Sequence, residues 1–195
     1  CGEGGALLLK NKTMLSKALI SWEKGTNRCD FLEGKVSKYY WVDRGGSFVL
    51  SELNAAVLYS QLSSREFILK ERLRIWHFYH AKLEHLENSK KLKRPFIPMH
   101  CEHNAHIYYI RVYDTRDSSR LAASAKKSKI GLFTHYEPLH ASTGAAKFAR
   151  VYQDCPETDL CALTLFRLPI WVGMSEAELE RVVKIIYLTL GDRST

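Results

Sequence analysis

Four side chains that could bind a metal lie within a short stretch, at His100, Cys101, His103 and His106. Zinc sites usually combine two separated pairs of ligands, for example a cysteine pair with a distant histidine pair. No second cluster in the sequence completes this one, so we expect no metal here. His106 begins a segment with strand character, and we expect it to face a cleft instead.

A second chemical cluster is the segment HYEPLH at 135–140. His135 and Tyr136 follow a predicted strand and precede Pro138, which restricts the turn. Loops at strand ends often carry binding groups. The residues alone leave two interpretations open, a binding site or a buried core histidine. No serine or cysteine stands in a nucleophile setting, so acyl transfer has no support.

The glycine-rich segment at 2–5 (GEGG) is the third candidate. No Gly-Lys-Ser/Thr follows it, so it is not a phosphate-binding loop. The glycines precede a predicted strand, whereas a dinucleotide-binding fingerprint follows one. By itself the segment predicts a tight turn that uses positive φ angles.

The helices and strands that position these groups follow two different patterns in the first and later parts of the chain. The first part of the chain predicts a short strand at 6–9, a helix at 13–22 capped by Thr13, and a long loop at 23–48. Helices follow from Ser51 to about Glu87, with a break at Ser63–Ser64. The later part alternates strands and helices, as in a small α+β domain. We expect strands at 107–113, 132–136 and 167–171, helices at 118–129 and 175–190, and short helices within 142–165; Ser175 and Glu178 predict a capping box.

Composition narrows the class of protein. The chain has 195 residues and a formal net charge of +8, which favours anionic partners. The basic run at 90–94 has no aromatic platform, so we expect a solvated loop and not a nucleic-acid site. The five cysteines are scattered and odd in number, which indicates reduced thiols. No segment is apolar for long enough to span a membrane, and we expect a cytoplasmic protein.

Six segments, taken together and in this order, resemble the DegT-type pyridoxal-phosphate-dependent nucleotide-sugar aminotransferases. They are GEGGALL (2–8), EKGTNR (23–28), KYYWVDRGGSFVLSELNAA (38–56), NAHIYYI (104–110), THYEPLH (134–140) and RLPIW (167–171). KGTNR followed by the aromatic KYYW stretch resembles the subgroup that aminates C4 of TDP-4-oxo-6-deoxyglucose.

The resemblance implies an α/β fold of the aspartate-aminotransferase type (fold type I), of which this chain is the C-terminal half. The implied division is the end of the large domain at 1–62, a linking helix at 63–94 and a small α+β domain at 95–195. The implied partners are a TDP-sugar, L-glutamate and a second copy of the chain in a homodimer with shared active sites.

The resemblance also implies site residues. Many relatives place an asparagine on the cofactor phosphate, and Ser47 takes that position here. The implied substrate-binding residues are Asn27, Arg28, Lys38, Tyr40, Asn104, His106, His135 and Tyr136. The family's Schiff-base lysine precedes GEGG, so it would lie before Cys1; Lys10 lies on the wrong side of the motif. We therefore expect no catalytic lysine in this chain and no transamination by the chain alone.

Four alternatives stay open. The chain could serve as a binding or assembly fragment of the same fold without activity. It could belong to an enzyme that aminates C3, or to a dehydratase of the same family, in which histidine replaces the lysine. A nucleic-acid-binding domain would show salt-sensitive binding to DNA.

Overall fold

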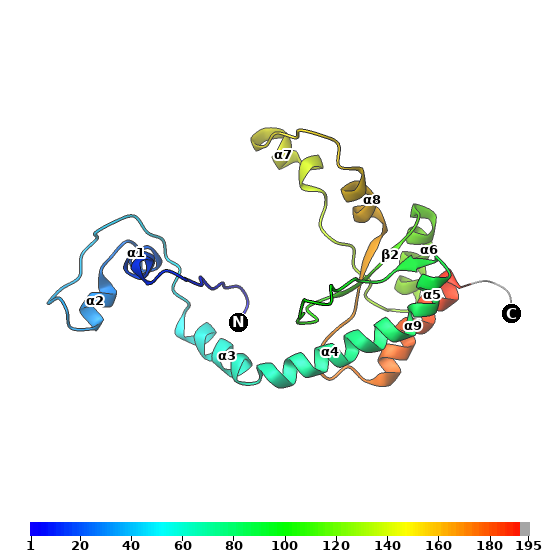
Figure 1. The fold of residues 1–195 in the computed structure, drawn as a ribbon, viewed down its shortest axis with the longest axis horizontal. Coiled ribbons are helices and arrows are strands. Elements are labelled where there is room, and N and C mark those ends of the chain that lie inside the picture. Colours follow the sequence, from blue (N-terminus) through cyan, green and yellow to red (C-terminus); the bar gives the residue numbers. More distant parts are fainter. Residues whose placement is uncertain (192–195) are drawn as a thin grey trace. The chain divides into compact units, whose positions relative to one another are not determined.

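The computed structural model describes residues 1–191 and divides them into two compact units, Cys1–Arg65 and a second that begins at Glu66. Figure 1 shows the elements of each unit along the chain. The three-part division expected from the sequence stays a prediction.

The first unit is built from short helices and a long loop. Its elements are a 3-10 helix η1 (Lys12–Met14) and the helices α1 (Leu15–Trp22), α2 (Arg28–Leu32) and α3 (Glu52–Ser63). Asn11 caps η1 by accepting from the Thr13 amide at 2.9 Å, so the expected cap at Thr13 is wrong. The expected strand at 6–9 is also wrong, because no described residue pairs with that segment and an unpaired strand leaves its backbone groups unsatisfied.

The second unit contains most of the helices and the sheet. Its helical elements are α4 (Arg65–Lys82, which starts one residue before the boundary), α5 (Glu84–Asn88), α6 (Thr115–Lys127), η2 (Leu139–Ala141), α7 (Thr143–Phe148), α8 (Pro156–Thr164) and α9 (Glu176–Leu190). The expected break between α3 and α4 is confirmed at Ser64. The capping box of α9 is also confirmed, with Ser175 and Glu178 each bonding the other's backbone.

An antiparallel sheet of three strands forms the centre of this unit, in the order β1 (Leu92–Lys93), β2 (Tyr108–Val112), β3 (Leu165–Leu168). The strand expected at 107–113 is confirmed. The strand expected at 167–171 lies earlier and ends before Pro169, which has no amide to donate. The segment at 132–136 contributes only a single bridge, between Phe133 and Arg167, so a full strand there is wrong.

The basic run at 90–94 is not a simple solvated loop. Leu92 pairs with Val112 at the edge of the sheet and is fully buried. The Arg94 side chain is 10% exposed and is ion-paired to Glu87. Leu92 and Lys93 form the edge strand β1, and Arg94 forms the ion pair, so three of the five residues in the run belong to the structure of the second unit.

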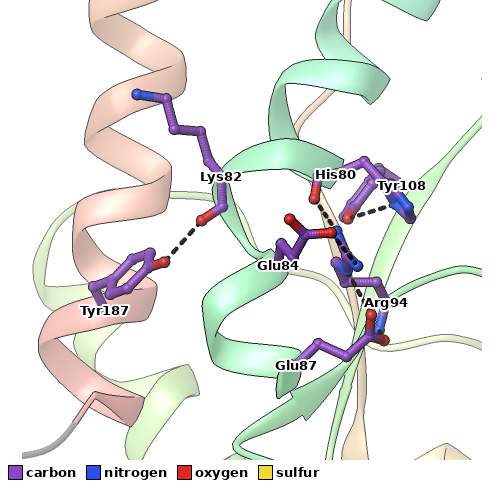
Figure 2. Close-up of polar contacts among 7 residues, drawn as sticks. All are labelled: His80, Lys82, Glu84, Glu87, Arg94, Tyr108 and Tyr187. Atoms are coloured by element: carbon purple, nitrogen blue, oxygen red, sulfur yellow. Dashed lines mark hydrogen bonds and ion pairs between the residues drawn. The ribbon is translucent and has the colours of Figure 1, made fainter. Parts of the chain in front are cut away.

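The hydrophobic core lies in the second unit. Alternate residues of β2, Tyr108, Ile110 and Val112, point inward, and they pack with Tyr79 of α4 and Ile186 of α9. Tyr187 of α9 donates to the Lys82 carbonyl at 2.8 Å, which joins α9 to α4 (Figure 2). None of the buried hydrophobic residues that the structure describes lies in 1–65. Within 1–191, no helix combines the length and apolarity that a membrane crossing requires.

Candidate functional site

The segment between α1 and α3, expected to be one long loop at 23–48, contains the short helix α2. We call it the loop between α1 and α3, and backbone pairing holds its two ends together. Lys24 donates to the Gly46 carbonyl at 3.0 Å, Val42 to the Gly25 carbonyl at 2.8 Å, and Asn27 to the Tyr40 carbonyl at 3.2 Å. Isolated bridges join Glu23 to Ser47 and Thr26 to Trp41. These hydrogen bonds and bridges give the loop a defined backbone although it has no hydrophobic core of its own. A loop with a defined backbone can hold binding residues in place.

Two glycines permit the close crossing of these ends. A Cβ atom at Gly45 would lie 2.0 Å from the Gly25 nitrogen, and one at Gly25 would lie 2.0 Å from the Asp43 carbonyl oxygen. Gly25 also has φ +78°, which disfavours other residues. The sequence GTNR therefore begins with a glycine for a steric reason.

Three of the predicted substrate residues lie together in this loop. The Asn27 side-chain oxygen accepts from the Tyr40 amide at 2.8 Å, so Asn27 fixes the loop. The Lys38 ammonium lies 5.7 Å from the centre of the Tyr40 ring, within cation–π range. Tyr40 is 59% exposed, and its ring is accessible to a ligand that stacks on it.

Arg28, a fourth predicted substrate residue, contacts the buried carboxylate of Glu23. The Glu23 side chain is 7% exposed, and its Oε1 accepts from Arg28 Nη1 at 3.2 Å. Its other oxygen, Oε2, is buried without a partner among the described residues. The Arg28 side chain is 43% exposed. No role for Glu23 was expected from the sequence, although this residue opens the EKGTNR motif.

Ser47, the predicted cofactor residue, lies on the loop's second end. Its backbone forms the bridge to Glu23. The residue is exposed, and its hydroxyl bonds to no other described residue. The hydroxyl is therefore available to donate to an anion.

In the second unit, Asn104 and His106 lie on a strained turn. Ala105, between them, has φ +47° and is fully buried. Asn104 Oδ1 accepts from the His106 amide at 3.0 Å. Arg72 of α4 donates to the Ala105 carbonyl at 3.0 Å and also to the His106 carbonyl, and its burial lowers its pKa. Arg72 is a residue of this turn that the sequence did not indicate.

His135 and Tyr136 lie on the segment that bridges to β3. Their rings are 5.7 Å apart, and Tyr136 is 84% exposed. Arg167 of β3 pairs with the Phe133 backbone in both directions and donates from Nη2 to the Thr134 carbonyl at 3.3 Å. Both predicted residues are exposed, which favours the binding interpretation over a core histidine.

The suspected metal cluster is not assembled. His103 packs its ring 4.5 Å from the Trp76 ring, while His100, Cys101 and His106 are exposed. Among residues 1–191, no three His, Cys, Asp or Glu side chains are grouped so as to hold a metal ion.

A polar cluster around Arg94 joins α4, α5 and the sheet (Figure 2). Arg94 bonds Glu87 twice, from its amide at 2.7 Å and from Nε at 2.6 Å, and it also donates to the His80 carbonyl. Burial alone would raise the pKa of Glu87, but these hydrogen bonds from Arg94 lower it. Burial and the nearby Arg94 charge lower the pKa of His80, whose ring stacks on Trp76 at 4.5 Å. These contacts hold Arg94, which follows β1, against α4 and α5.

The predicted site residues are thus distributed over both units. Five lie in the first unit: Asn27, Arg28, Lys38, Tyr40 and Ser47. Four lie in the second: Asn104, His106, His135 and Tyr136. Their assignment to cofactor and substrate stays a prediction. Three further residues, Glu23, Arg72 and Arg167, hold the segments that carry them.

With this fold and these segments, the sequence profile of the DegT/DnrJ/EryC1/StrS aminotransferase family matches residues 1–187, and the chain belongs to this family. An uncharacterized protein of Methanocaldococcus jannaschii is 26% identical over 193 residues, which is 95% of this chain and 49% of that protein. The chain therefore spans about half the length of this relative.

Solved structures agree with the expected fold. A DegT/DnrJ/EryC1/StrS aminotransferase from Brucella abortus matches 93% of this chain and 45% of its own length, with 21% identity and a TM-score of 0.75. A putative sugar aminotransferase from Streptococcus pneumoniae matches 93% of this chain and 44% of its own, with 16% identity and a TM-score of 0.77. The expected fold class, an aspartate-aminotransferase-like fold of type I, is confirmed.

Proposed function

We propose that this chain forms the C-terminal half of a nucleotide-sugar aminotransferase that uses pyridoxal 5'-phosphate. The family match over residues 1–187 carries the proposal. Pneumococcal sugar aminotransferase structures of similar fold have been solved in PLP and PMP forms, which supports the cofactor.

The residues present fit the phosphate of that cofactor. Ser47 offers an exposed hydroxyl on a loop end that the bridge to Glu23 fixes. A hydroxyl donates one hydrogen bond, where the asparagine of many relatives offers an amide. When bound, the cofactor supplies an electron sink for moving an amine between carbon atoms.

This chain's own residues then bind and orient the substrate. Arg28 and Lys38 offer cations for a diphosphate, and the accessible Tyr40 ring offers a stacking surface for a base. The imidazoles of His106 and His135 are exposed and can hydrogen-bond a sugar. We further propose that the complete protein is a cytoplasmic homodimer with shared active sites, as the resemblance to the family implies.

For the reaction we propose transfer of the amine of L-glutamate to C4 of a TDP-4-oxo-6-deoxyhexose, for surface polysaccharide synthesis. The KGTNR and KYYW segments support this subgroup, and the proposed substrate is anionic, as the chain's net charge of +8 favours.

The test uses the protein made from the whole reading frame that contains this chain, supplied with pyridoxal phosphate. We expect a yellow protein that converts TDP-4-oxo-6-deoxyglucose and L-glutamate into a 4-amino sugar, identified by mass and NMR. The matched control substrate is the 3-oxo isomer. Preference for that isomer would indicate a C3 aminotransferase, and loss of a hydroxyl without amine gain would indicate a dehydratase. A colourless protein would contradict cofactor binding.

A further inference from the structure

Glu23 has an arrangement that its contribution to stability does not explain. Transfer of a carboxylate from water into the protein is unfavourable unless both oxygens find partners. Here only Oε1 is bonded, to Arg28 Nη1 at 3.2 Å, while Oε2 is buried without a partner among the described residues. An ion pair that served stability alone would use the two-point contact that arginine and carboxylate readily form.

The one-point contact has a consequence for Arg28. A guanidinium has five N–H donors in a rigid plane, and the Glu23 contact uses a single nitrogen. The Arg28 side chain stays 43% exposed, so its other donors face outward from a fixed anchor. Lys24 also contacts this carboxylate, with its Nζ 3.8 Å from Glu23 Oε1. The Lys24 side chain is 54% exposed.

The backbone of Glu23 is itself fixed. Its carbonyl accepts from the Thr26 amide at 3.0 Å and from the Thr26 hydroxyl at 2.8 Å, and its strand-like bridge reaches Ser47. The next residue, Lys24, has φ +62°, a conformation that is unfavourable for a non-glycine residue and common at functional sites. The carboxylate thus has a defined position from which to hold the Arg28 side chain.

We propose that Glu23 is a positioning residue that anchors Arg28 so that its free donors bind the diphosphate of the nucleotide-sugar. This inference rests on the proposed function and deepens it. Anchoring one nitrogen leaves an edge of the guanidinium for phosphate oxygens, and it removes the rotamer freedom that an unanchored arginine would lose on binding.

The test uses the protein from the whole reading frame. Glu23→Ala should raise the KM for the nucleotide-sugar by roughly tenfold, because a charge-assisted contact orders Arg28. The rate of amine uptake from L-glutamate, followed by the cofactor's visible spectrum, should stay unchanged. Glu23→Gln keeps an acceptor oxygen and the side chain's shape, so its KM should lie between those of wild type and Glu23→Ala. Glu33→Gln, an exposed acid of the same loop, is the matched control.

Direct binding separates the diphosphate from the base. By calorimetry, Glu23→Ala should weaken binding of TDP by roughly tenfold and leave thymidine binding unchanged. In an Arg28→Lys background, the effect of Glu23→Ala should nearly vanish, because the two residues act as one unit.

Other outcomes would overturn the inference. They are equal losses in the glutamate and sugar reactions, equal weakening of TDP and thymidine, or additive effects with Arg28→Lys. If Glu23→Ala does not fold, Glu23→Gln and Arg28→Lys supply the same comparison. A wild-type protein that takes no amine from glutamate would refute the proposed function, while the TDP titrations would still decide the role of Glu23.

Discussion

At the scale of single residues, the second unit holds its exposed polar groups by arginines from other elements. Arg72 of α4 donates to the carbonyls of Ala105 and His106, and Arg167 of β3 donates to the Thr134 carbonyl. The positive φ of Ala105 costs about 1 kcal/mol or more, and the Arg72 contacts offset it. These arginines hold the backbone at His106 and next to His135 and leave both imidazoles uninvolved.

Ser47 gives the first test at this scale. If its hydroxyl binds the cofactor phosphate, Ser47→Ala in the complete protein should weaken cofactor binding by about tenfold to a hundredfold, because a hydrogen bond to a charged group contributes roughly 1.5–3 kcal/mol. Visible absorbance after dialysis at graded cofactor concentrations measures this. Ser16→Ala, an exposed serine of α1, should have no effect. Cofactor affinity that stays at the wild-type level would remove Ser47 from the site.

His135 gives the second test at the scale of single residues. The side chain is exposed on the segment that Arg167 holds, and it stands beside Tyr136. His135→Ala should raise the KM for the nucleotide-sugar severalfold and leave that for glutamate nearly unchanged, because one lost hydrogen bond to a neutral partner contributes about 1 kcal/mol. His100→Ala is the exposed control. Equal changes in both KM values would assign His135 a structural role.

The histidines around Trp76 predict a pH dependence of stability. Burial, Arg94 and His77 lower the pKa of His80, although Glu87 and Glu84 act in the opposite direction; burial and His77 lower that of His103. The unfolded chain therefore binds protons that the folded chain does not. Stability is fully present above the unfolded value of about 6.5 and falls as the pH drops below it.

Urea unfolding followed by tryptophan fluorescence should therefore give a lower midpoint at about pH 5.5 than at about pH 7.5. His80→Gln should reduce this difference, while His85→Gln, an exposed histidine of α5, should retain it. A difference of the same size in both variants would show that other groups cause the loss.

At the scale of elements, the loop between α1 and α3 depends on the crossing of Gly25 and Gly45. Gly45→Ala places a methyl group 2.0 Å from the Gly25 nitrogen, so the two loop ends must separate. Such overlap typically costs about 1–3 kcal/mol. Limited trypsin digestion of the complete protein should cut faster at Lys35 and Lys38. Gly5→Ala, with nothing within 4 Å of its Cβ, should digest like wild type.

The same elements show how far the sequence could predict the structure. Local sequence signals were sufficient to predict α9, because its capping residues, its apolar face and its end all lie within one continuous segment. Local signals were not sufficient to predict strand pairing. The bridge at Phe133 and the edge strand at Leu92 depend on partners far along the chain. The site followed the same rule. The motifs were enough to propose the exposed residues of NAH and THY as site residues, and that assignment stays a prediction. The contacts of Arg72 and Glu23 depend on the folded backbone, and no motif indicated them.

At the scale of the whole chain, apolar burial is unequal between the units. The described core belongs to the second unit, whereas large side chains of the first are open to solvent, including Trp41 (82% exposed), Leu53 (81%) and Tyr59 (75%). Monomeric soluble proteins rarely leave such sets uncovered. About half the length of the relatives lies outside this chain, and the family's other half and a second subunit are the surfaces we propose to cover these residues.

This proposal predicts a difference between the chain alone and the protein from its whole reading frame. The chain alone should bind an apolar fluorescent dye strongly and elute from a sizing column as mixed, concentration-dependent species, because its first unit exposes apolar side chains. The complete protein should bind little dye and elute as one dimer. Replacing Leu53 and Tyr59 of α3 by glutamine should lower dye binding by the chain alone, and it should weaken the dimer of the complete protein. If the chain alone is monodisperse and does not bind the dye, its exposed apolar side chains do not require a covering surface. If the complete protein stays monomeric, a second subunit does not contribute to the proposed site.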